Sequence, residues 1–250
     1  MFKDHFSKNS AGYGRYRPHY PEELFAHLAA IAPGHDRAWD CACGTGQAAM
    51  GLRGHFREVV ATDASASQIN KAEPCPGISY RVARAEDSEL GAATINLITV
   101  AQALHWFDLP AFFQEAERVL HDNGVLAAWT YNLFSVNPAV DAVVDRLYAG
   151  ALAPYWPAER GMVENGYRDI PFPFAAVVAP HFAMQEKWDF SQLIGYIETW
   201  SAVTAYRKSE NPSALAAMFA EIGRAWGDTA ARCTVTWPLT LIIRRKVTSS

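Results

Sequence analysis

The sequence predicts an α/β protein built on a doubly wound, mostly parallel sheet, and three observations support this class. Between residues 37 and 131, short apolar segments alternate with segments of helical periodicity. A glycine turn with Gly44 and Gly46 follows the first apolar segment and precedes a helical one. The fourth apolar segment, TINLITVAQ, is almost continuous, as in strands that a parallel sheet buries on both faces.

The front half of the chain alternates helices and strands. A first helix opens at Pro21, with Glu22 and Glu23 in its first turn, where the helix dipole favours acidic side chains. Ser65 is the expected N-cap of a short helix after the second strand. This alternation indicates right-handed crossover connections between parallel strands. The expected helices are 21–32, 47–56, 65–73 and 109–120, and the expected strands are 37–42, 58–63, 78–84, 94–102 and 124–131.

After Asn132 the rhythm changes, and we expect a helical insert followed by a closing strand. Pro238 lies within the last apolar segment, which indicates an edge position or a bulge. That last strand is therefore expected to pair antiparallel with the alternating segment 181–190. The expected helices of this half are 137–152, 191–203 and 212–227, and the last strand is 233–246.

Length and composition limit the possible functions. The 250 residues suffice for one large α/β domain with insertions or for two small domains. Half of the residues are hydrophobic and 19% are charged, so the chain can bury a full core. The formal net charge is -4, from 22 basic and 26 acidic residues, and the basic cluster 244–246 is interpreted as a solvated strand end. We therefore expect no nucleic-acid partner, and no obligatory protein partner is evident.

The termini and the cysteines indicate a cytoplasmic protein. The first 21 residues contain no apolar stretch with a cleavage site, and no segment approaches the ~20 apolar residues of a transmembrane helix. Cys41, Cys43, Cys75 and Cys233 form no C-x-x-C pair and no metal-ligand spacing with histidine. We expect reduced thiols, no bound metal and no membrane association.

The stretch WDCACGTGQAAMGL allows two interpretations. Gly44, Gly46 and Ala49 satisfy the dinucleotide fingerprint G-x-G-x-x-G/A, which predicts a nicotinamide-dependent oxidoreductase. Asp40, however, places a carboxylate at the end of the preceding strand, where it would repel a diphosphate and attract an amine. S-adenosylmethionine has no phosphate and carries an amino group and a sulfonium. The charge of Asp40 therefore favours this methyl donor over a nicotinamide dinucleotide.

A second carboxylate, Asp63, ends the second strand. It can accept hydrogen bonds from two ribose hydroxyls, as acidic residues at this position do in nucleotide-binding sheets. Alternatively it caps a turn, because TDASAS is rich in capping residues. The spacing from the glycine turn favours the ribose role and therefore an adenosine-containing ligand.

Five motifs follow one another along the chain: DCACGTG, VVATDASASQI, ARAEDSEL, TVAQALHWFD and EAERVLHDNGVLAAWTY. Their order and spacing resemble class I S-adenosylmethionine-dependent methyltransferases, in the branch known as methyltransferase type 11. YGRYRPHYP and QALHWF resemble the trans-aconitate methyltransferase relatives within that branch. The resemblance covers about residues 10–132 and the last strand, and residues 136–231 carry no recognised motif. It implies a Rossmann-like, mostly parallel seven-stranded sheet with an antiparallel last strand.

The resemblance also implies a domain organisation. Residues 1–250 would form a single methyltransferase domain. Within it, 10–132 would be the donor-binding core with an N-terminal lid, 133–231 a helical and aromatic insert that shapes the acceptor pocket, and 232–247 the closing strand. The chain departs from the family pattern at Ala42, which replaces a glycine, and at Ile95-Asn96, which replaces Phe-Asp. The alanine is tolerated if its φ stays below zero.

Roles for individual residues follow from the same resemblance. Asp40 would hold the amino group of S-adenosylmethionine, Asp63 the ribose hydroxyls, and the acidic residues after the third strand the adenine amino group. The end of the fourth strand would lie beside the sulfonium. The residues that the resemblance places around this donor are Asp40, Ala42, Gly44, Gly46, Gln47, Asp63, Ala64, Glu86, Asp87, Gln102 and Ala103, with Tyr13 and Arg17 from the lid.

His105 is the candidate catalytic residue. In-line displacement on a sulfonium methyl needs the acceptor held ~3 Å away and water excluded. A carboxylate acceptor needs no general base, whereas a hydroxyl or protonated amine needs one, and His105 lies just past the fourth strand. The alternative is that His105 and Trp106 pack over the donor without chemistry.

The acceptor is expected to be a small molecule, with a carboxylic acid among the candidates. Arginine can bind a carboxylate through its two-pronged guanidinium group, so Arg15 and Arg17 could hold an acidic acceptor. The alternative is a capping segment with its charges in water. An aromatic-lined pocket suits a small organic acceptor. A catalytically idle protein that binds the donor is a further alternative. The residues expected at the acceptor are Arg15, Trp106, Tyr131 and Trp200.

Overall fold

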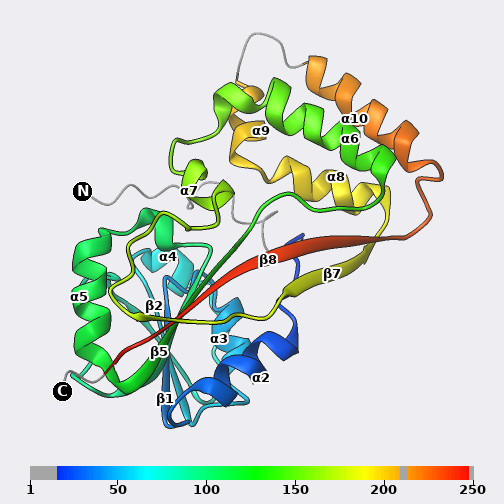
Figure 1. Ribbon diagram of the computed structural model, residues 1–250. Helices are drawn as coiled ribbons and strands as arrows, with labels where there is room; N and C mark the ends of the chain where they lie inside the picture. Colours follow the sequence, from blue (N-terminus) through cyan, green and yellow to red (C-terminus); the bar gives the residue numbers. More distant parts are fainter. Residues whose placement is uncertain (1–15, 209–212, 248–250) are drawn as a thin grey trace. The chain divides into compact units, whose positions relative to one another are not determined.

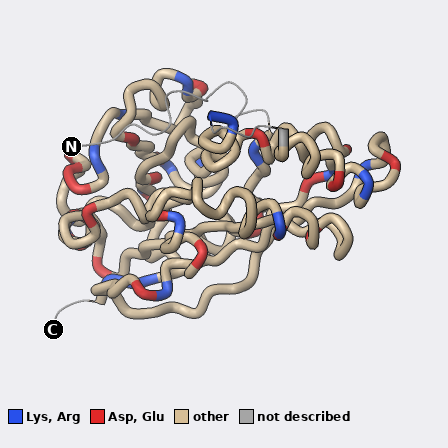
Figure 2. Tube along the Cα trace, turned by 90° about the horizontal axis from the view of Figure 1, so that it is seen from above, with Lys and Arg blue, Asp and Glu red and all other residues tan. Residues whose placement is uncertain are grey.

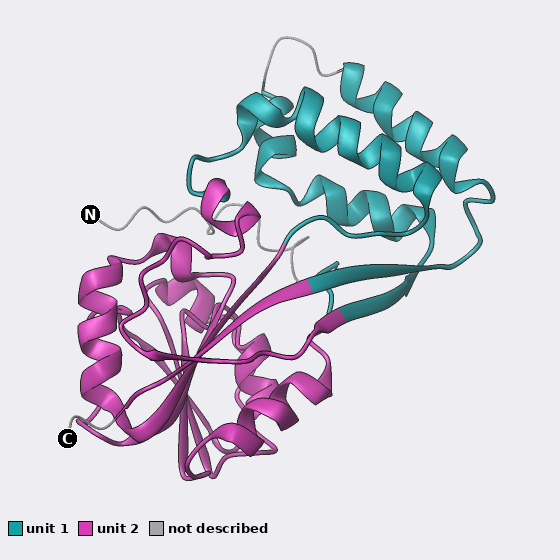
Figure 3. Cartoon of the chain, in the orientation of Figure 1, with its two compact units in different colours: residues 1–19, 132–160, 184–238 teal, residues 20–131, 161–183, 239–250 magenta. Residues whose placement is uncertain are grey.

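The computed structural model describes residues 16–208 and 213–247, and this part of the chain divides into two compact units (Figure 3). Of the described residues, unit 1 holds 16–19, 132–160 and 184–238, and unit 2 holds 20–131, 161–183 and 239–247. The predicted organisation as one domain with an insert stays a prediction. Residues 161–183, which that prediction assigns to the insert, belong to unit 2.

The strands form one eight-stranded sheet with the order β3-β2-β1-β4-β5-β8-β6, and β7 pairs with β8 off this path (Figure 1). Strands β1 to β5 are parallel where they pair, and β8 runs antiparallel to β5 and β6. The predicted fold class and the pairing of the last strand with segment 181–190 are confirmed, with eight strands instead of seven. The strands are β1 (Arg37–Cys41), β2 (Glu58–Asp63), β3 (Ile78–Val82), β4 (Ile95–Ala101), β5 (Leu120–Tyr131), β6 (Ala175–Val177), β7 (Phe182–Trp188) and β8 (Cys233–Arg245).

Most helices occur where periodicity predicts them, but several are shorter, and α7 was not predicted. The helix predicted at 191–203 is divided between α8 and α9, because the Thr199 hydroxyl donates to the Tyr196 carbonyl (2.6 Å) and competes with the helical hydrogen bonds. Ser65 is at the N-cap of α4, but its side chain makes no capping hydrogen bond. The α-helices are α2 (Glu22–Ile31), α3 (Gln47–Leu52), α4 (Ala66–Ile69), α5 (Leu109–Val119), α6 (Pro138–Arg146), α7 (Arg160–Glu164), α8 (Phe190–Glu198), α9 (Ser201–Tyr206) and α10 (Ser213–Trp226). The short turns are η1 (Leu104–Trp106), η2 (Leu147–Ala151) and η3 (Ala153–Tyr155).

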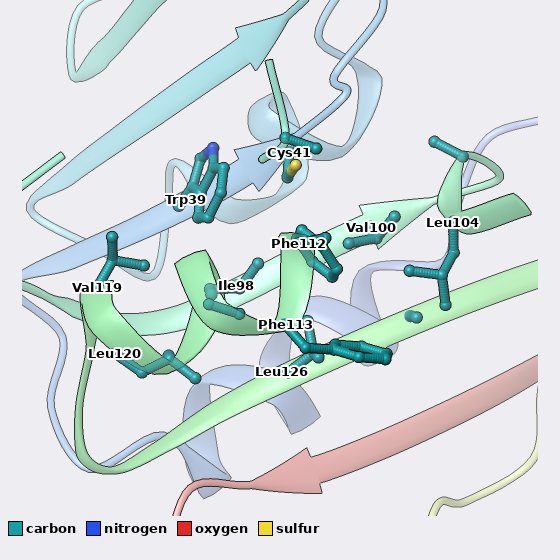
Figure 4. Close-up of a cluster of buried hydrophobic side chains, with 14 of the residues drawn as sticks. Trp39, Cys41, Ile98, Val100, Leu104, Phe112, Phe113, Val119, Leu120 and Leu126 are labelled. Atoms are coloured by element: carbon teal, nitrogen blue, oxygen red, sulfur yellow. The ribbon is translucent and has the colours of Figure 1, made fainter. Parts of the chain in front are cut away.

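The core of unit 2 lies between α5 and the sheet (Figure 4). Phe112, Ala116 and Val119 repeat at helical spacing and are fully buried, as their periodicity predicts. The Phe112 ring lies 6.3 Å from the ring of Trp39 on β1, centroid to centroid. The indole N–H of Trp39 donates to Thr62 Oγ1 (2.9 Å), which satisfies its one polar group in the apolar interior.

Helices α2 and α3 touch at Gly51. A Cβ on Gly51 would lie 2.1 Å from the ring of Phe25, which is 3% exposed. Only a residue without a side chain allows this close approach. The contact fixes α3, and therefore the glycine turn that precedes it.

The interior of unit 1 is built largely from aromatic rings. Trp237 on β8 packs against Trp188 on β7 (4.9 Å between centroids), against Tyr196 on α8 (5.4 Å) and against Phe134 (5.9 Å). All three contacts are edge-on, an arrangement that the ring quadrupole favours. These four aromatic residues of the back half are thus core residues, whereas Trp156 and Trp200 are partly exposed.

Charged residues of both signs are interspersed along the chain, as Figure 2 shows. None of the helices in the described part of the chain is both long and apolar enough to cross a bilayer.

Candidate active site at the carboxyl edge of the sheet

The glycine turn is tied to both neighbouring strands of unit 2. Asp40, near the end of β1, is fully buried, and its Oδ1 accepts a hydrogen bond from the Thr99 hydroxyl of β4 (3.0 Å). The backbone N–H of Cys43 donates to the Thr62 carbonyl of β2 (2.9 Å). The turn therefore has a fixed position at the carboxyl ends of β1, β2 and β4, where open α/β sheets bind ligands.

The backbone of the turn has positive φ at Ala42 (55°), Gly44 (56°) and Gly46 (92°). The condition under which the alanine would be tolerated without strain, a negative φ, is not met at Ala42. An alanine in the left-handed region costs about 1–2 kcal/mol, because its Cβ approaches a carbonyl oxygen. Strain of this kind persists only where the surrounding structure determines the conformation.

The two glycines serve different purposes. A Cβ on Gly46 would lie 2.3 Å from the hydroxyl oxygen of Tyr80 on β3, so Gly46 makes room for that ring. A Cβ on Gly44 would meet no described atom within 4 Å. Gly44 therefore borders open space at the start of α3, and a ligand can approach its backbone there. Tyr80 was not predicted from the sequence.

Asp63 at the end of β2 stabilises the same turn. Its Oδ2 accepts from the Gly44 N–H (2.9 Å) and its Oδ1 from the Ser65 N–H (2.8 Å). The turn-capping interpretation of Asp63 is thus correct in part. A carboxylate has lone pairs for about four hydrogen bonds, so its ribose role is compatible with these two and stays a prediction. Ala64 and Gln47 are half-buried beside this turn.

The loop after β3 holds the two acidic residues predicted at the adenine. Glu86 accepts from Arg84 Nε (3.1 Å) and from the Asp108 backbone N–H at the start of α5 (3.1 Å). Asp87 is exposed. The next residue, Ser88, is fully buried, and its N–H donates to Glu115 of α5 (3.0 Å). The contacts with the Asp108 N–H and with Glu115 hold the loop against α5.

The end of β4 is strained and heavily hydrogen-bonded. Gln102 has a φ of 58°. Its backbone N–H donates to the Trp129 carbonyl (2.9 Å), its Nε2 donates to the Tyr131 carbonyl (3.1 Å), and its Oε1 accepts from the Thr130 hydroxyl. Ala103 is buried at the start of η1. Strained residues of this kind gather at functional sites.

His105 lies on η1 and is half-buried. A hydrogen bond of 2.9 Å joins its Nδ1 to the hydroxyl oxygen of Tyr167, and its ring lies 4.7 Å from that of Trp106. Tyr167 is 1% exposed, and burial raises its pKa, so it keeps its proton near neutral pH. The sequence offers only an indirect signal for Tyr167: it follows Asn165-Gly166, a dipeptide typical of turns.

The structure brings most of the predicted site residues together on the edge of unit 2, from Asp40 to Ala103 with His105, Trp106 and Tyr131. Tyr131 ends β5 and is 7% exposed. Arg17 and Trp200 belong to unit 1, where the Trp200 ring packs against the rings of Phe134, Tyr148 and Trp156. Tyr13 and Arg15 lie outside the described residues.

The two cysteines of the turn are protonated thiols. Burial raises the pKa of Cys41 and of Cys43, and the neighbouring Asp40 raises both further. A thiol is a weak nucleophile and a weak metal ligand, because the thiolate does this chemistry. Among the described residues, no group of three or more histidines, cysteines and acidic residues is arranged to hold a metal ion.

A parallel sheet with a glycine turn after its first strand and a carboxylate at the end of its second defines a nucleoside-binding α/β protein. The comparisons with known proteins specify the family. Residues 39–128 match the family model described as a methyltransferase domain. A proposed methyltransferase of Dictyostelium discoideum is 31% identical over 252 residues, which cover 98% of this chain and 96% of the relative.

Two further comparisons agree. The structure of a proposed type II methyltransferase from Anaeromyxobacter dehalogenans superposes with a TM-score of 0.89 at 45% identity, over 93% of this chain and 99% of that one. The malonyl-[acyl-carrier protein] O-methyltransferase of Dechloromonas aromatica is 33% identical over 115 residues, 45% of this chain and 40% of that protein.

The chain therefore belongs to the methyltransferase family and is a class I enzyme that uses S-adenosylmethionine. The prediction of S-adenosylmethionine as the cofactor is confirmed, and the role of the glycine turn in holding it stays a prediction. The alternative of a nicotinamide-dependent oxidoreductase is wrong, because the family model and the relatives are methyltransferases. The fingerprint G-x-G-x-x-G/A is therefore not specific for dinucleotide enzymes. The likeness to trans-aconitate methyltransferase relatives stays a prediction.

Proposed function

We propose that this methyltransferase modifies a small organic acceptor by in-line displacement at the carboxyl edge of the sheet in unit 2. S-adenosylmethionine supplies an activated methyl group on a sulfonium, so the protein needs little covalent chemistry of its own. Its residues bind the two reactants, align them and exclude water. A proton has to be removed only if the acceptor carries one on the attacking atom.

The residues of the turn fit the donor. Gly44 borders open space into which the methionine portion can extend. The buried carboxylate of Asp40, on β1 just before the turn, favours an amino group. Asp63 at the end of β2 is the candidate for the ribose hydroxyls, and Glu86 and Asp87, in the loop after β3, are the candidates for the adenine. Gln102 and Ala103 would border the sulfonium. These roles, with the lid role of Tyr13 and Arg17, rest on the family resemblance and on this arrangement.

One observation carries the proposal of a small acceptor. A hollow of about 240 Å³ in unit 2 is bordered by Tyr167, whose hydroxyl bonds to His105. Its volume is somewhat below that of typical small-molecule sites, about 300–1,000 Å³, and suits a small acceptor. Most of its lining is apolar, which suits an organic molecule. The lining consists of Leu109, Gly161, Met162, Asn165, Tyr167, Asp169, Ile170 and Pro171.

A carboxylic acid is the first acceptor class to test. A carboxylate attacks without losing a proton, and the name of the Dechloromonas relative describes O-methylation of a malonyl group. Arg15 and Arg17 are the candidates to hold such an anion, and Trp106, Tyr131 and Trp200 are the aromatic candidates. Hydroxyl acceptors are the second class, because His105 lies at the same edge and can take a proton.

The test measures transfer of a labelled methyl group from S-adenosylmethionine to a panel of small carboxylic acids and phenols. We expect a labelled ester or ether with at least one member of the panel. Asp63→Ala serves as the matched inactive control, because it should lose the donor. Label that enters protein or nucleic acid, with none in the small molecules, would overturn the proposal of a small acceptor.

A further inference from the structure

Gln102 joins the end of β4 to the end of β5 by three hydrogen bonds. Its backbone N–H donates to the Trp129 carbonyl (2.9 Å). In its side chain, Nε2 donates to the Tyr131 carbonyl (3.1 Å) and Oε1 accepts from the Thr130 hydroxyl. Both polar atoms of this side chain therefore face β5, and Gln102 is bonded to three consecutive residues of that strand.

The two partners on β5 fix the orientation of the Gln102 amide. A backbone carbonyl only accepts, so the group that faces Tyr131 is the NH₂, and the amide oxygen faces Thr130. Thr130 is fully buried and Tyr131 is 7% exposed. Polar groups at buried positions are costly when they lack a partner. A glutamine at position 102 supplies a partner to one acceptor and to one donor of β5.

The side chain of Gln102 takes the place of a backbone N–H in the sheet. β4 and β5 pair in parallel up to Ala101 and Trp129, and the Gln102 N–H continues this ladder to the Trp129 carbonyl. In a parallel ladder, the next hydrogen bond from β4 would run from the N–H of Leu104 to the Tyr131 carbonyl. Leu104 instead begins η1, and Gln102 Nε2 makes the bond to Tyr131. The sheet thus keeps this hydrogen bond although β4 has already ended.

The backbone turns sharply at the same residue. The φ of Gln102 is 58°, in the left-handed region that residues with a Cβ rarely adopt. A strained conformation persists only where the surrounding structure determines it. The three hydrogen bonds to β5 do so here, because they fix both the backbone N–H and the side chain of Gln102. Beyond this turn the chain leaves the sheet through Ala103 and enters η1.

We propose that Gln102 is a positioning residue for methyl transfer. Its amide ends β4 without the loss of a hydrogen bond and thereby fixes where the segment 103–106 leaves the sheet. That segment lies at the carboxyl edge, where the sulfonium is predicted to bind. Gln102 acts through this segment and not through contact of its side chain with a reactant. This role rests on the proposed function, whereas the hydrogen bonds of Gln102 do not.

Two variants of similar shape separate the hydrogen bonds of Gln102 from its volume. Gln102→Met has no amide and lacks the side-chain bonds at every pH. In Gln102→Glu, the ionised carboxylate has only acceptor oxygens, so one of them is repelled by the Tyr131 carbonyl. The protonated carboxyl has one O–H donor and one acceptor oxygen, and it reproduces the pattern of the amide. The hydrogen bonds of Gln102→Glu should therefore return when the pH is lowered.

Kinetics at several pH values test the positioning role with an acceptor that the enzyme methylates. Gln102→Met should lower kcat about tenfold to a hundredfold at every pH, because a small misplacement of reactants costs about 10²-fold. The kcat of Gln102→Glu, divided by that of the unmodified protein, should rise about tenfold as the introduced carboxyl is protonated, above its ordinary pKa of about 4.3. The division removes the pH dependence that both proteins share. Gln114→Met, at an exposed glutamine of α5, should keep its kcat.

The KM for S-adenosylmethionine should change little in both variants, because the other predicted donor contacts, on β1 and β2, are intact. A kcat ratio of Gln102→Glu that does not vary with pH would overturn the proposal. A rise in KM as large as the fall in kcat would also overturn it, since Gln102 would then bind the donor directly.

Hydrogen exchange of the side-chain amide tests the contacts without any acceptor. Gln102→Met assigns the NMR signals of this NH₂ group by their loss. We expect its protons to exchange at least about tenfold more slowly than those of the exposed Gln114. Equal exchange rates would overturn the proposal. If the label enters protein or nucleic acid, the proposed small acceptor is wrong, and the same kinetic comparison with that acceptor still tests Gln102.

Discussion

The carboxyl edge of the sheet and the core beneath α5 belong to the same unit, yet they follow different rules. In the core, fully buried side chains such as Phe112, Ile98 and Val119 satisfy both their helix or strand periodicity and their packing. At the edge, Ala42 and Gln102 adopt positive φ, and Asp40 is a carboxylate without solvent exposure. Local preference and global structure agree in the core and conflict at the edge. Positive φ alone does not mark the edge, because Ala93 before β4 and Asn123 in the first part of β5 also adopt it. At the carboxyl edge it occurs together with a buried carboxylate, a combination expected at a ligand site.

The largest expected effect is the fall in turnover when the candidate base at the edge is removed. His105→Gln should lower turnover of a hydroxyl acceptor by about 10²–10⁴-fold, because general-base catalysis contributes about that much. The affinity for S-adenosylmethionine and the free energy of unfolding should change little. Steady-state kinetics, donor titration and urea unfolding measure the three quantities. His181→Gln, at an exposed histidine of the same unit, is the control. Unchanged turnover in His105→Gln would remove His105 from the mechanism.

The second effect concerns the donor. Asp63→Ala removes the acceptor for the Gly44 and Ser65 N–H groups together with the predicted ribose contacts. Hydrogen bonds to a charged group contribute about 1.5–3 kcal/mol, so we expect the Kd for S-adenosylmethionine to rise about tenfold to a hundredfold. Calorimetric titration measures it. Asp122→Ala, at an exposed carboxylate on β5, should bind the donor as the unmodified protein does. A Kd for Asp63→Ala within twofold of the unmodified value would contradict the ribose role.

A substitution in the core should change the free energy of unfolding, whereas the two edge substitutions above should change turnover and donor binding. Gly51→Ala places a methyl group against the buried ring of Phe25, and overpacking of this kind lowers the free energy of unfolding by about 1–3 kcal/mol. Gly54→Ala is the matched control, because a Cβ there meets no described atom within 4 Å. Urea unfolding compares the two variants. Equal stability of both would show that α2 and α3 can separate at little cost.

The same contrast explains what the sequence could predict. The core and most strands follow from periodicity, because an apolar stripe has to face an apolar partner. The glycine turn, Asp63 and His105 could be located because each lies at the end of a strand or within a few residues after it. The contact of His105 with Tyr167 joins residues 62 positions apart, and no local pattern predicts such a pair. Likewise, the sign of φ at Ala42 depends on the tertiary contacts of the turn and not on the residue type.

A smaller effect links the edge to the core through pH. Burial raises the pKa of Glu115, but hydrogen bonds from Arg118 and Ser88 lower it by more, so its net shift is downward. A carboxyl with a lowered folded-state pKa stabilises the protein above its unfolded pKa, about 4.3, and loses this contribution as the pH falls through the folded value.

Glu115→Gln should therefore lower the free energy of unfolding at neutral pH, and its deficit should shrink as the pH falls below about 4.3. Urea unfolding of both proteins at several pH values gives that difference, in which other titrating groups cancel. Glu117→Gln, on the exposed side of the same helix, should show a much weaker dependence. A deficit that stays constant with pH would mean that Glu115 acts by packing and not by charge.

The smallest effect tests the strain itself. Ala42→Gly restores the residue type that a φ of 55° favours. Relief of about 1–2 kcal/mol of left-handed strain is opposed by the greater entropy of glycine in the unfolded chain, about 0.4–1 kcal/mol, so we expect a net gain in stability of roughly 0.5–1 kcal/mol. Thermal and urea unfolding measure this gain. A loss of stability would mean that the alanine methyl group contributes packing at the turn that exceeds its backbone strain, and the edge would then resemble the core more than its dihedral angles indicate.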